Sequence, residues 1–323
     1  MRAVVCREFG PPEGLQIEDL ADPKPGPGEL LVEVRAAAVT FPDALIVQDQ
    51  YQFKASLPFV PGGEASGIVR SLGEGVDGFE PGDAVCGGMQ TGGFAELAVV
   101  RSDACRKLPA GLDFESAPGL LYSYGTALYG LRDRGQTKPG ETLLVLGAGG
   151  ALGIAAIETG KLLGARVIAA ASTPEKLELA RASGADEFID YSKEDLKERT
   201  KELTRGRGAD LVFDAVGGAY SEAALRATAW EGRFLVIGFT AGIAQIPLNL
   251  PLLKGCQIVG VFLGAQHGRD PEWGEAMRRE IDDLCAEGKL NPGIGGTYSL
   301  DRAPEALRDL LDRRAVGRLV VTP

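Results

Sequence analysis

The sequence contains a single histidine, His267, and only five cysteines among its 323 residues. We expect His267 to be a loop or surface residue, with a place at the mouth of an active site as the alternative. The cysteines form no C-x-x-C pair, as is typical of reduced thiols in a cytosolic protein. They lie far apart, at Cys6, Cys86, Cys105, Cys256 and Cys285. One histidine and dispersed cysteines do not supply the ligands of a catalytic metal site, so we expect no metal.

Basic residues are in the minority, and the formal net charge is −11. This charge argues against nucleic acid or an anionic membrane surface as the main partner, since both require a basic surface. No apolar run approaches the roughly 20 residues that span a bilayer. The N-terminal segment MRAVVCREFG carries charges where a signal peptide needs an apolar stretch. We therefore expect a cytoplasmic protein with no membrane or nucleic-acid partner.

The segment Thr142–Gly153 (TLLVLGAGGALG) has the clearest functional pattern. Its apolar run has the length of one buried strand, and residues 154–163 continue with a helical pattern. Between them lie four glycines, Gly147, Gly149, Gly150 and Gly153. In a strand–turn–helix context, such glycines allow a tight turn and close backbone approach to a pyrophosphate at the helix N-terminus. The segment predicts a dinucleotide site, and a glycine-rich packing turn is the alternative.

The length suggests two domains. Residues 1–122 have short apolar strands, including 2–6 and 30–36, separated by Pro–Gly turns, which favours a β-barrel-like unit. Residues 123–264 alternate strands with helices. Residues 265–323 hold two helices and a last strand, 318–321, which we expect to return to the N-terminal unit and complete it.

The alternation within 123–264 predicts parallel βαβ units in a doubly wound sheet. We expect its strands at 142–146, 166–171, 187–190, 210–213, 233–237 and 257–262. Ligands of such sheets bind at the carboxyl ends of the strands. Glycines follow two of these ends, at Gly217–Gly218 and Gly238, where they favour close approach of the cofactor; ordinary loop chemistry is the alternative.

The end of the second strand of this sheet indicates which nicotinamide cofactor is used. Enzymes that prefer NAD have an acidic residue about 20 residues past the glycines. Here the strand ends in alanines and Ser172. Glu175 has the spacing of a capping box with Ser172. Lys176 lies in the first helical turn, where a cation is disfavoured, so we predict that it binds the 2′-phosphate of NADPH. A solvated surface lysine is the alternative.

From end to end, the sequence resembles the medium-chain dehydrogenase/reductase superfamily, and within it the zinc-free quinone oxidoreductase (zeta-crystallin-like) branch. The resemblance implies a GroES-like β-barrel catalytic domain, a Rossmann doubly wound parallel-sheet domain, and NADPH in the cleft between them. The matching motifs include residues 61–67 (PGGEASG), 79–85 (FEPGDAV), 93–96 (GFAE), 124–127 (YGTA), the glycine turn, 182–186 (ASGAD), 214–218 (DAVGG) and the C-terminal segment 288–321.

Zinc-dependent relatives have a cysteine at the position of Thr40 and a histidine at that of Gly63, and neither residue found here is a usual zinc ligand. The four-cysteine structural zinc lobe is missing too. Without a Lewis acid to lower the pKa of an alcohol, the resemblance implies reduction of an electrophilic acceptor.

The resemblance also implies catalytic-site residues. Zinc-free relatives often have asparagine where this chain has Thr40, in the segment Thr40-Phe41-Pro42-Asp43. Asp43 matches the family, with helix capping as its alternative role. Tyr51 lies in a segment that resembles the substrate-side loop, and a tyrosine packed at the surface is the alternative. We expect the hydroxyls of Thr40 and Tyr51 to polarise the acceptor carbonyl.

The predicted cofactor site extends beyond the glycines and Lys176. Thr126 matches a threonine on the cofactor side, with a helix N-cap as its alternative role. The other positions that we include are Ala151, Leu152, Ser172, Tyr191, Gly238 and Phe262.

The resemblance predicts an NADPH:quinone reductase whose partner is a small electrophilic acceptor. An enone or enoyl-CoA thioester reductase is the first alternative, and a non-catalytic NADPH-binding structural or sensor protein is the second. We also expect a homodimer through the strand at 257–262, which is apolar and carries no charge to protect a sheet edge.

Overall fold

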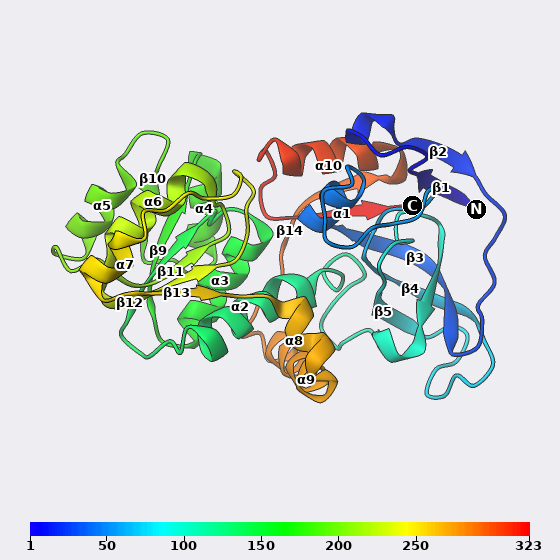
Figure 1. Ribbon diagram of the computed structural model, residues 1–323. Coiled ribbons are helices and arrows are strands. Elements are labelled where there is room, and N and C mark those ends of the chain that lie inside the picture. Colours follow the sequence, from blue (N-terminus) through cyan, green and yellow to red (C-terminus); the bar gives the residue numbers. More distant parts are fainter. The chain divides into compact units, whose positions relative to one another are not determined.

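The computed structural model describes all 323 residues, and the chain divides into two compact units. Unit 1 consists of Met1–Leu120 together with Pro292–Pro323, and unit 2 is Leu121–Asn291. Figure 1 shows the elements of both units. No helix is both long enough and apolar enough to cross a lipid bilayer, and no disulfide joins the cysteines, which are all buried.

Unit 1 is built on a seven-stranded sheet with the order β14-β15-β3-β4-β5-β7, in which β6 also pairs with β3. The separate strands β1 and β2 form an antiparallel pair. The elements of unit 1 in chain order are β1 (Arg2–Val5), β2 (Gln16–Asp19), β3 (Glu29–Val39), α1 (Phe41–Ile46), β4 (Glu64–Leu72), β5 (Ala84–Gly88), β6 (Leu97–Arg101), β7 (Cys105–Lys107), β14 (Ile294–Ser299), α10 (Ala303–Leu311) and β15 (Arg318–Thr322).

The long strand β3 is central to this sheet, because three other strands pair with it. β4 runs antiparallel along one side of β3. On the other side, β6 pairs with residues 29–33 and β15 pairs with residues 37–39. β15 is thus held between β3 and the parallel strand β14. The C-terminal segment therefore completes the sheet that the N-terminal segment begins.

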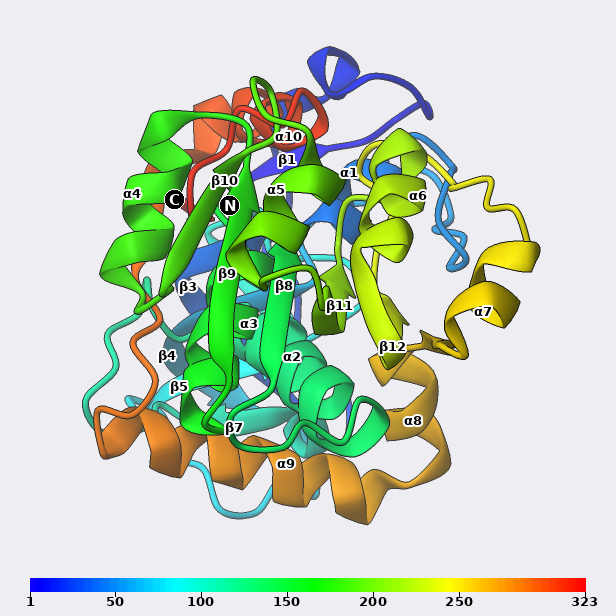
Figure 2. The same ribbon diagram turned by 90° about the vertical axis from the view of Figure 1, so that its left-hand side faces the viewer.

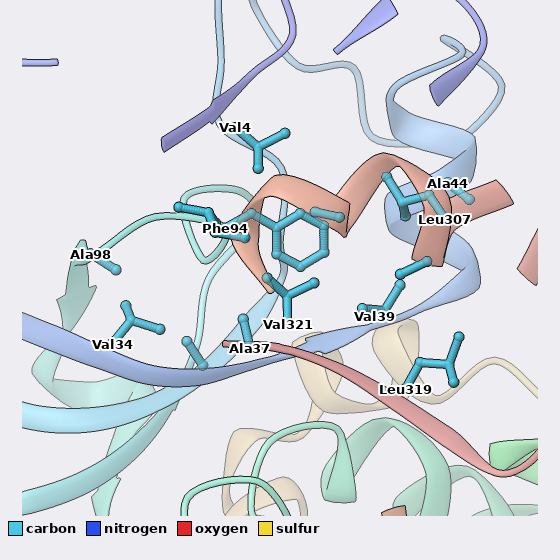
Figure 3. Packing of buried hydrophobic residues seen from close by; sticks show 14 residues of the cluster. Val4, Val34, Ala37, Val39, Ala44, Phe94, Ala98, Leu307, Leu319 and Val321 are labelled. Atoms are coloured by element: carbon cyan, nitrogen blue, oxygen red, sulfur yellow. The ribbon is translucent and has the colours of Figure 1, made fainter. Parts of the chain in front are cut away.

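The main core of unit 1 combines side chains from both segments (Figure 3). Phe94 is fully buried and lies near Val321 of β15 and Leu307 of α10. Val4, Val34, Val39 and Leu319 belong to the same buried cluster. Burial of each such side chain contributes roughly 1.5–3 kcal/mol, so the C-terminal strand and helix supply a large part of the stabilisation of this unit.

Unit 2 contains a six-stranded, fully parallel sheet with the order β10-β9-β8-β11-β12-β13. Two π-helical segments, η3 (Leu121–Gly125) and η4 (Tyr129–Arg134), flank α2 (Thr126–Leu128) before the sheet. The remaining elements are β8 (Thr142–Leu146), α3 (Ala151–Leu162), β9 (Arg166–Ala171), α4 (Pro174–Ala182), β10 (Glu187–Asp190), α5 (Leu196–Leu203), β11 (Ala209–Asp214), α6 (Gly218–Ala227), β12 (Thr228–Val236), α7 (Asn249–Lys254), β13 (Gln257–Gly260), α8 (Leu263–Arg269) and α9 (Pro271–Ala286).

Helices cover both faces of this sheet, as Figures 1 and 2 show. α3 and α4 pack against β8, β9 and β10 on one face, and α5 and α6 pack against β10, β11 and β12 on the other. Burial from both sides explains why all five residues of β8 are buried and why Leu143–Leu146 are apolar. The strand order reverses between β8 and β11, and the crevice outside the carboxyl ends at this point is the expected ligand site.

The structure corrects our assignment of residues 265–291, which belong to unit 2 and not to the C-terminal return. The apolar face of α9 buries Met277, Ile281 and Cys285. Nη1 of Arg132 also donates to both carboxylate oxygens of Glu280 at 2.7 Å. These contacts hold α9 against the start of unit 2, where it packs on η3.

The sequence prediction did not include β14 or α7. β14 contains Gly295 and Gly296, which are poor strand formers, and it is placed by its pairing with β15. In addition, β12 begins five residues earlier than the predicted start at 233, and β13 ends at Gly260, two residues before the predicted end.

Candidate functional site

The glycine turn follows β8 and leads directly into α3. Gly147 has φ +70°, and a Cβ at Gly153 would lie 2.2 Å from the Gly147 carbonyl oxygen, so the turn itself requires both glycines. Gly150 is the N-cap of α3 and no side chain caps it. The N–H groups of Ala151 and Leu152 have no hydrogen-bond partner within the protein. Their unpartnered N–H groups and the helix dipole favour an anion at this position.

Lys176 lies beside this turn and is only 9% exposed, unlike its neighbours Thr173, Pro174 and Glu175. The solvated-surface alternative for Lys176 is therefore wrong. The predicted capping box is wrong as well, because the N-cap of α4 is Thr173 and not Ser172. The Thr173 hydroxyl oxygen accepts from the Lys176 N–H at 3.3 Å. Lys176 thus occupies the third position of the helix, directly next to the glycine turn.

The carboxyl ends of β9 and β10 are adjacent, and two further predicted residues follow them. Ser172 comes directly after β9 and Tyr191 directly after β10. The N–H of Tyr191 donates to the Ala171 carbonyl at 3.1 Å. The Tyr191 ring contacts Tyr220 of α6, with ring centroids 4.7 Å apart. Sequence reasoning missed Tyr220, since no local pattern relates it to a residue on another strand.

Asp214, at the carboxyl end of β11, organises the other side of the crevice. Its buried carboxylate accepts from the N–H groups of Val216 (2.9 Å) and Gly217 (2.8 Å) and from the Ser221 hydroxyl (2.5 Å). The Gly238 N–H donates to the Asp214 carbonyl at 3.1 Å, which ties the end of β12 to this loop. Sequence reasoning gave Asp214 no role, although an aspartate after an apolar strand and before glycines is a signal for such a turn.

Three other predicted positions have different environments. Thr126 is buried inside a helix, and its hydroxyl donates to the Tyr122 carbonyl at 2.5 Å, so the N-cap alternative is wrong. Phe262 lies between β13 and α8 and is 60% exposed. His267 is in α8 and not in a loop, and its ring occupies the space above Gly274. Burial lowers the pKa of His267.

In unit 1, Thr40 and Asp43 form a reciprocal pair at the start of α1. Thr40 is the N-cap, and its N–H and hydroxyl donate to Asp43 Oδ2 at 2.8 and 2.6 Å. The backbone N–H groups of Gly62 and Gly63 also reach this carboxylate. Asp43 is 2% exposed, and burial raises its pKa to about 6. This geometry favours the capping role for Asp43. The only hydroxyl proton of Thr40 is donated to Asp43 and is therefore not available to a ligand.

Tyr51 differs from Thr40 in that no hydrogen bond within the protein engages its hydroxyl. Its ring is half-buried against a cluster that includes Ile46, Val47 and Phe59. Burial and, to a smaller extent, the charge of Asp43 raise the pKa of Tyr51. The hydroxyl therefore stays protonated at neutral pH and can donate a hydrogen bond to a ligand.

No group of three or more His, Cys, Asp or Glu side chains comes together anywhere in the chain in a way that could hold a metal ion. Zinc-dependent relatives have their cysteine and histidine ligands at the positions of Thr40 and Gly63. Here the Thr40 hydroxyl is hydrogen-bonded to Asp43, and Gly63 has no side chain. The residues present therefore do not fit a catalytic zinc ion.

Comparison with known proteins identifies relatives over the full length of the chain. Residues 26–110 match the family described as "Alcohol dehydrogenase GroES-like domain", and residues 151–281 match "Zinc-binding dehydrogenase". A "Quinone oxidoreductase-like protein 2 homolog" from Nematostella vectensis is 39% identical over 99% of this chain and 88% of its own length. The "Quinone oxidoreductase" of Pseudomonas aeruginosa is 33% identical over 98% and 97% of the two chains.

Solved structures show the same fold over both chains. The Escherichia coli quinone oxidoreductase, crystallised in complex with NADPH, has a TM-score of 0.91 and 29% sequence identity, and the match covers 100% of each chain. The whole architecture described above is therefore shared with that protein.

We predict that Asp43 gives the stability of unit 1 a distinct pH dependence. A native pKa of about 6, against roughly 3.9 unfolded, means that the native state binds the proton more tightly. The contribution of Asp43 is therefore fully present below about pH 4 and is lost as the pH rises through 6. Relative to Asp43→Asn, which does not titrate, the wild type should lose about 2 kcal/mol between pH 4 and 7 in urea unfolding. A wild-type-to-variant difference that stays constant over this range would contradict the assignment.

Proposed function

The chain belongs to the quinone oxidoreductase branch of the medium-chain dehydrogenase/reductase superfamily, and on this premise we propose that it reduces a quinone with NADPH. Family membership supports an NADPH-dependent oxidoreductase. The observation that carries the cofactor assignment is the unpartnered N–H groups of the glycine turn beside the buried Lys176. The turn would hold the pyrophosphate, and Lys176 the 2′-phosphate.

The chemistry supplied by the bound cofactor is hydride donation to an electrophilic carbon. The protein has to bind both reactants, orient them, and stabilise the negative charge that develops on the acceptor carbonyl oxygen. Tyr51 is the best donor for that oxygen, because its hydroxyl has no partner within the protein. Thr40 is less suited than we expected, since its proton is engaged by Asp43. Both hydroxyls are poor proton reservoirs at neutral pH, so we propose that the final proton comes from solvent.

The missing zinc ligands support the proposed acceptor class. Without a Lewis acid, an alcohol is not activated for oxidation, whereas a quinone or enone is already electrophilic. Oxidation of NADPH should be followed by its absorbance with quinones, enones and enoyl-CoA thioesters. Turnover with quinones supports our proposal, and turnover restricted to enones or thioesters replaces it with the first alternative. NADPH binding without any turnover would indicate a non-catalytic protein.

We expect Lys176→Ala to raise the dissociation constant of NADPH roughly 10- to 100-fold and to leave that of NADH nearly unchanged. The reason is the loss of one charge-assisted contact with phosphate, worth about 1.5–3 kcal/mol. Titration calorimetry with both cofactors measures the effect. Lys193→Ala is the matched control, because Lys193 is an exposed lysine that follows β10 and pairs with Asp190. Equal affinities of the wild type for both cofactors would refute the role of Lys176.

Tyr51→Phe is expected to lower kcat roughly tenfold with little change in the dissociation constant of NADPH. One lost neutral hydrogen bond in the transition state accounts for this size. Tyr298→Phe serves as the control, because the Tyr298 hydroxyl is engaged by Asp309 at 2.6 Å. If Tyr51→Phe keeps full turnover, the donor is another group.

We further propose that the protein forms a homodimer through β13. This strand ends the sheet, and residues 257–262 carry no charge that would protect an open edge. Ile258 on β13 and the nearby Phe262 are exposed. Exposed apolar side chains on neighbouring elements of unit 2 extend the surface, namely Trp230, Leu248, Leu252 and Leu253.

Light scattering should give the mass of a dimer for the wild type and of a monomer for Ile258→Lys, which places a charge on the edge. Leu162→Lys is the matched control, because Leu162 (39% exposed) and Ile258 (40%) are equally accessible but Leu162 lies on α3. A wild-type monomer at micromolar concentration would rule out this assembly.

A further inference from the structure

Gly149 differs from the other glycines of the turn in what surrounds it. A Cβ built on Gly149 would lie 2.3 Å from Cβ, 2.5 Å from Cγ and 2.9 Å from Cα of Lys176. Its three nearest neighbours are therefore all atoms of one lysine. By contrast, the neighbours at Gly153 are backbone atoms of the turn, and Gly150 has nothing closer than 3.6 Å.

These distances are too short to be relieved by rotating the lysine side chain. Cα and Cβ of Lys176 are fixed by the first turn of α4, which the cap at Thr173 anchors. Any side chain at position 149 would have to push the start of α4 away from the glycine turn. Because Gly149 is itself buried, the lysine stem covers it and a ligand does not need to approach it.

We propose that Gly149 is a positioning residue for cofactor specificity, which acts through Lys176 and not through the pyrophosphate. This inference rests on the proposed use of NADPH. An exposed lysine loses much rotamer freedom when it binds a phosphate. The stem of Lys176, seated on Gly149, has lost that freedom before binding, so its ammonium group is preorganised for the 2′-phosphate. Gly150, at the open end of the turn, would instead affect NADH and NADPH alike.

The test compares Gly149→Ala with Gly150→Ala by titration calorimetry with NADPH and NADH. Gly149→Ala should raise the NADPH dissociation constant roughly tenfold and change that of NADH less than about twofold. Gly150→Ala should weaken both cofactors by the same factor. In a Lys176→Ala background, Gly149→Ala should not change the NADPH-to-NADH ratio further, since both substitutions act on one contact. An unchanged ratio in folded Gly149→Ala, or an equal loss for both cofactors, would overturn the inference.

A second pair of variants decides the case in which Gly149→Ala fails to fold. Lys176→Gly removes Cβ and Cγ, the two atoms that lie closest to the new methyl group, and leaves only the contact with Cα at 2.9 Å. If the double variant Gly149→Ala/Lys176→Gly folds, judged by circular dichroism and thermal unfolding, the glycine is required for the lysine. If it fails to fold while Lys176→Gly alone folds, the glycine serves another purpose and the inference is wrong. If the wild type does not prefer NADPH, the proposed use of NADPH is wrong. If the wild type prefers NADPH and Lys176→Ala alone changes that preference, only the role proposed for Gly149 is wrong.

Discussion

The antiparallel pairing of β15 with β3 is the constraint on which the rest of the structure depends. Leu319–Val321 lie against Ala37–Val39, so the first sheet closes only with residues from far along the chain. Unit 2 is therefore an insertion between the two segments of unit 1. The chain leaves unit 1 at the first residue of unit 2 and returns to unit 1 after the last. Glu158 of α3 serves both ends, since its Oε2 accepts from the Tyr124 hydroxyl at 2.9 Å and from the Asn291 N–H at 2.8 Å. A single carboxylate thus hydrogen-bonds to residues near both ends of unit 2.

Within each unit, the candidate site depends on which polar groups are already satisfied. The Thr40 and Thr126 hydroxyls donate to groups of the protein, and the Asp214 carboxylate holds a loop. The groups left for a ligand include the N–H groups at the start of α3 and the Tyr51 hydroxyl. Hydrogen bonds within the protein therefore restrict which side chains can bind a ligand, beyond what the residue types alone indicate.

The sequence predicted the parallel sheet well, because strands buried on both faces are short apolar runs; β8, β9 and β10 have the predicted bounds. It missed β14, whose glycines disfavour a strand and which exists through pairing with β15. The glycine turn was predictable because local spacing encodes it. The burial of Lys176, its contact with Gly149 and the Tyr191–Tyr220 pair were not, since each joins residues from different elements. The contact of Thr40 with Asp43 is local by contrast, since both residues belong to the first turn of α1, and the sequence had already offered capping as one of two roles for Asp43.

The pairing of β3 with β15 also imposes an order in time on the synthesis of the protein. About 280 residues separate Val39 from Leu319, so a ribosome that adds roughly 5–20 residues per second needs about 14–56 s between them. Throughout that interval, the edge of β3 at residues 37–39, which later pairs with β15, has no partner strand on the nascent chain. All of unit 2, by contrast, has been synthesised by residue 291 and can fold at once. Unit 2 is thus expected to fold first, and β3 is the strand that a chaperone would have to shield until the last residues of the chain emerge from the ribosome.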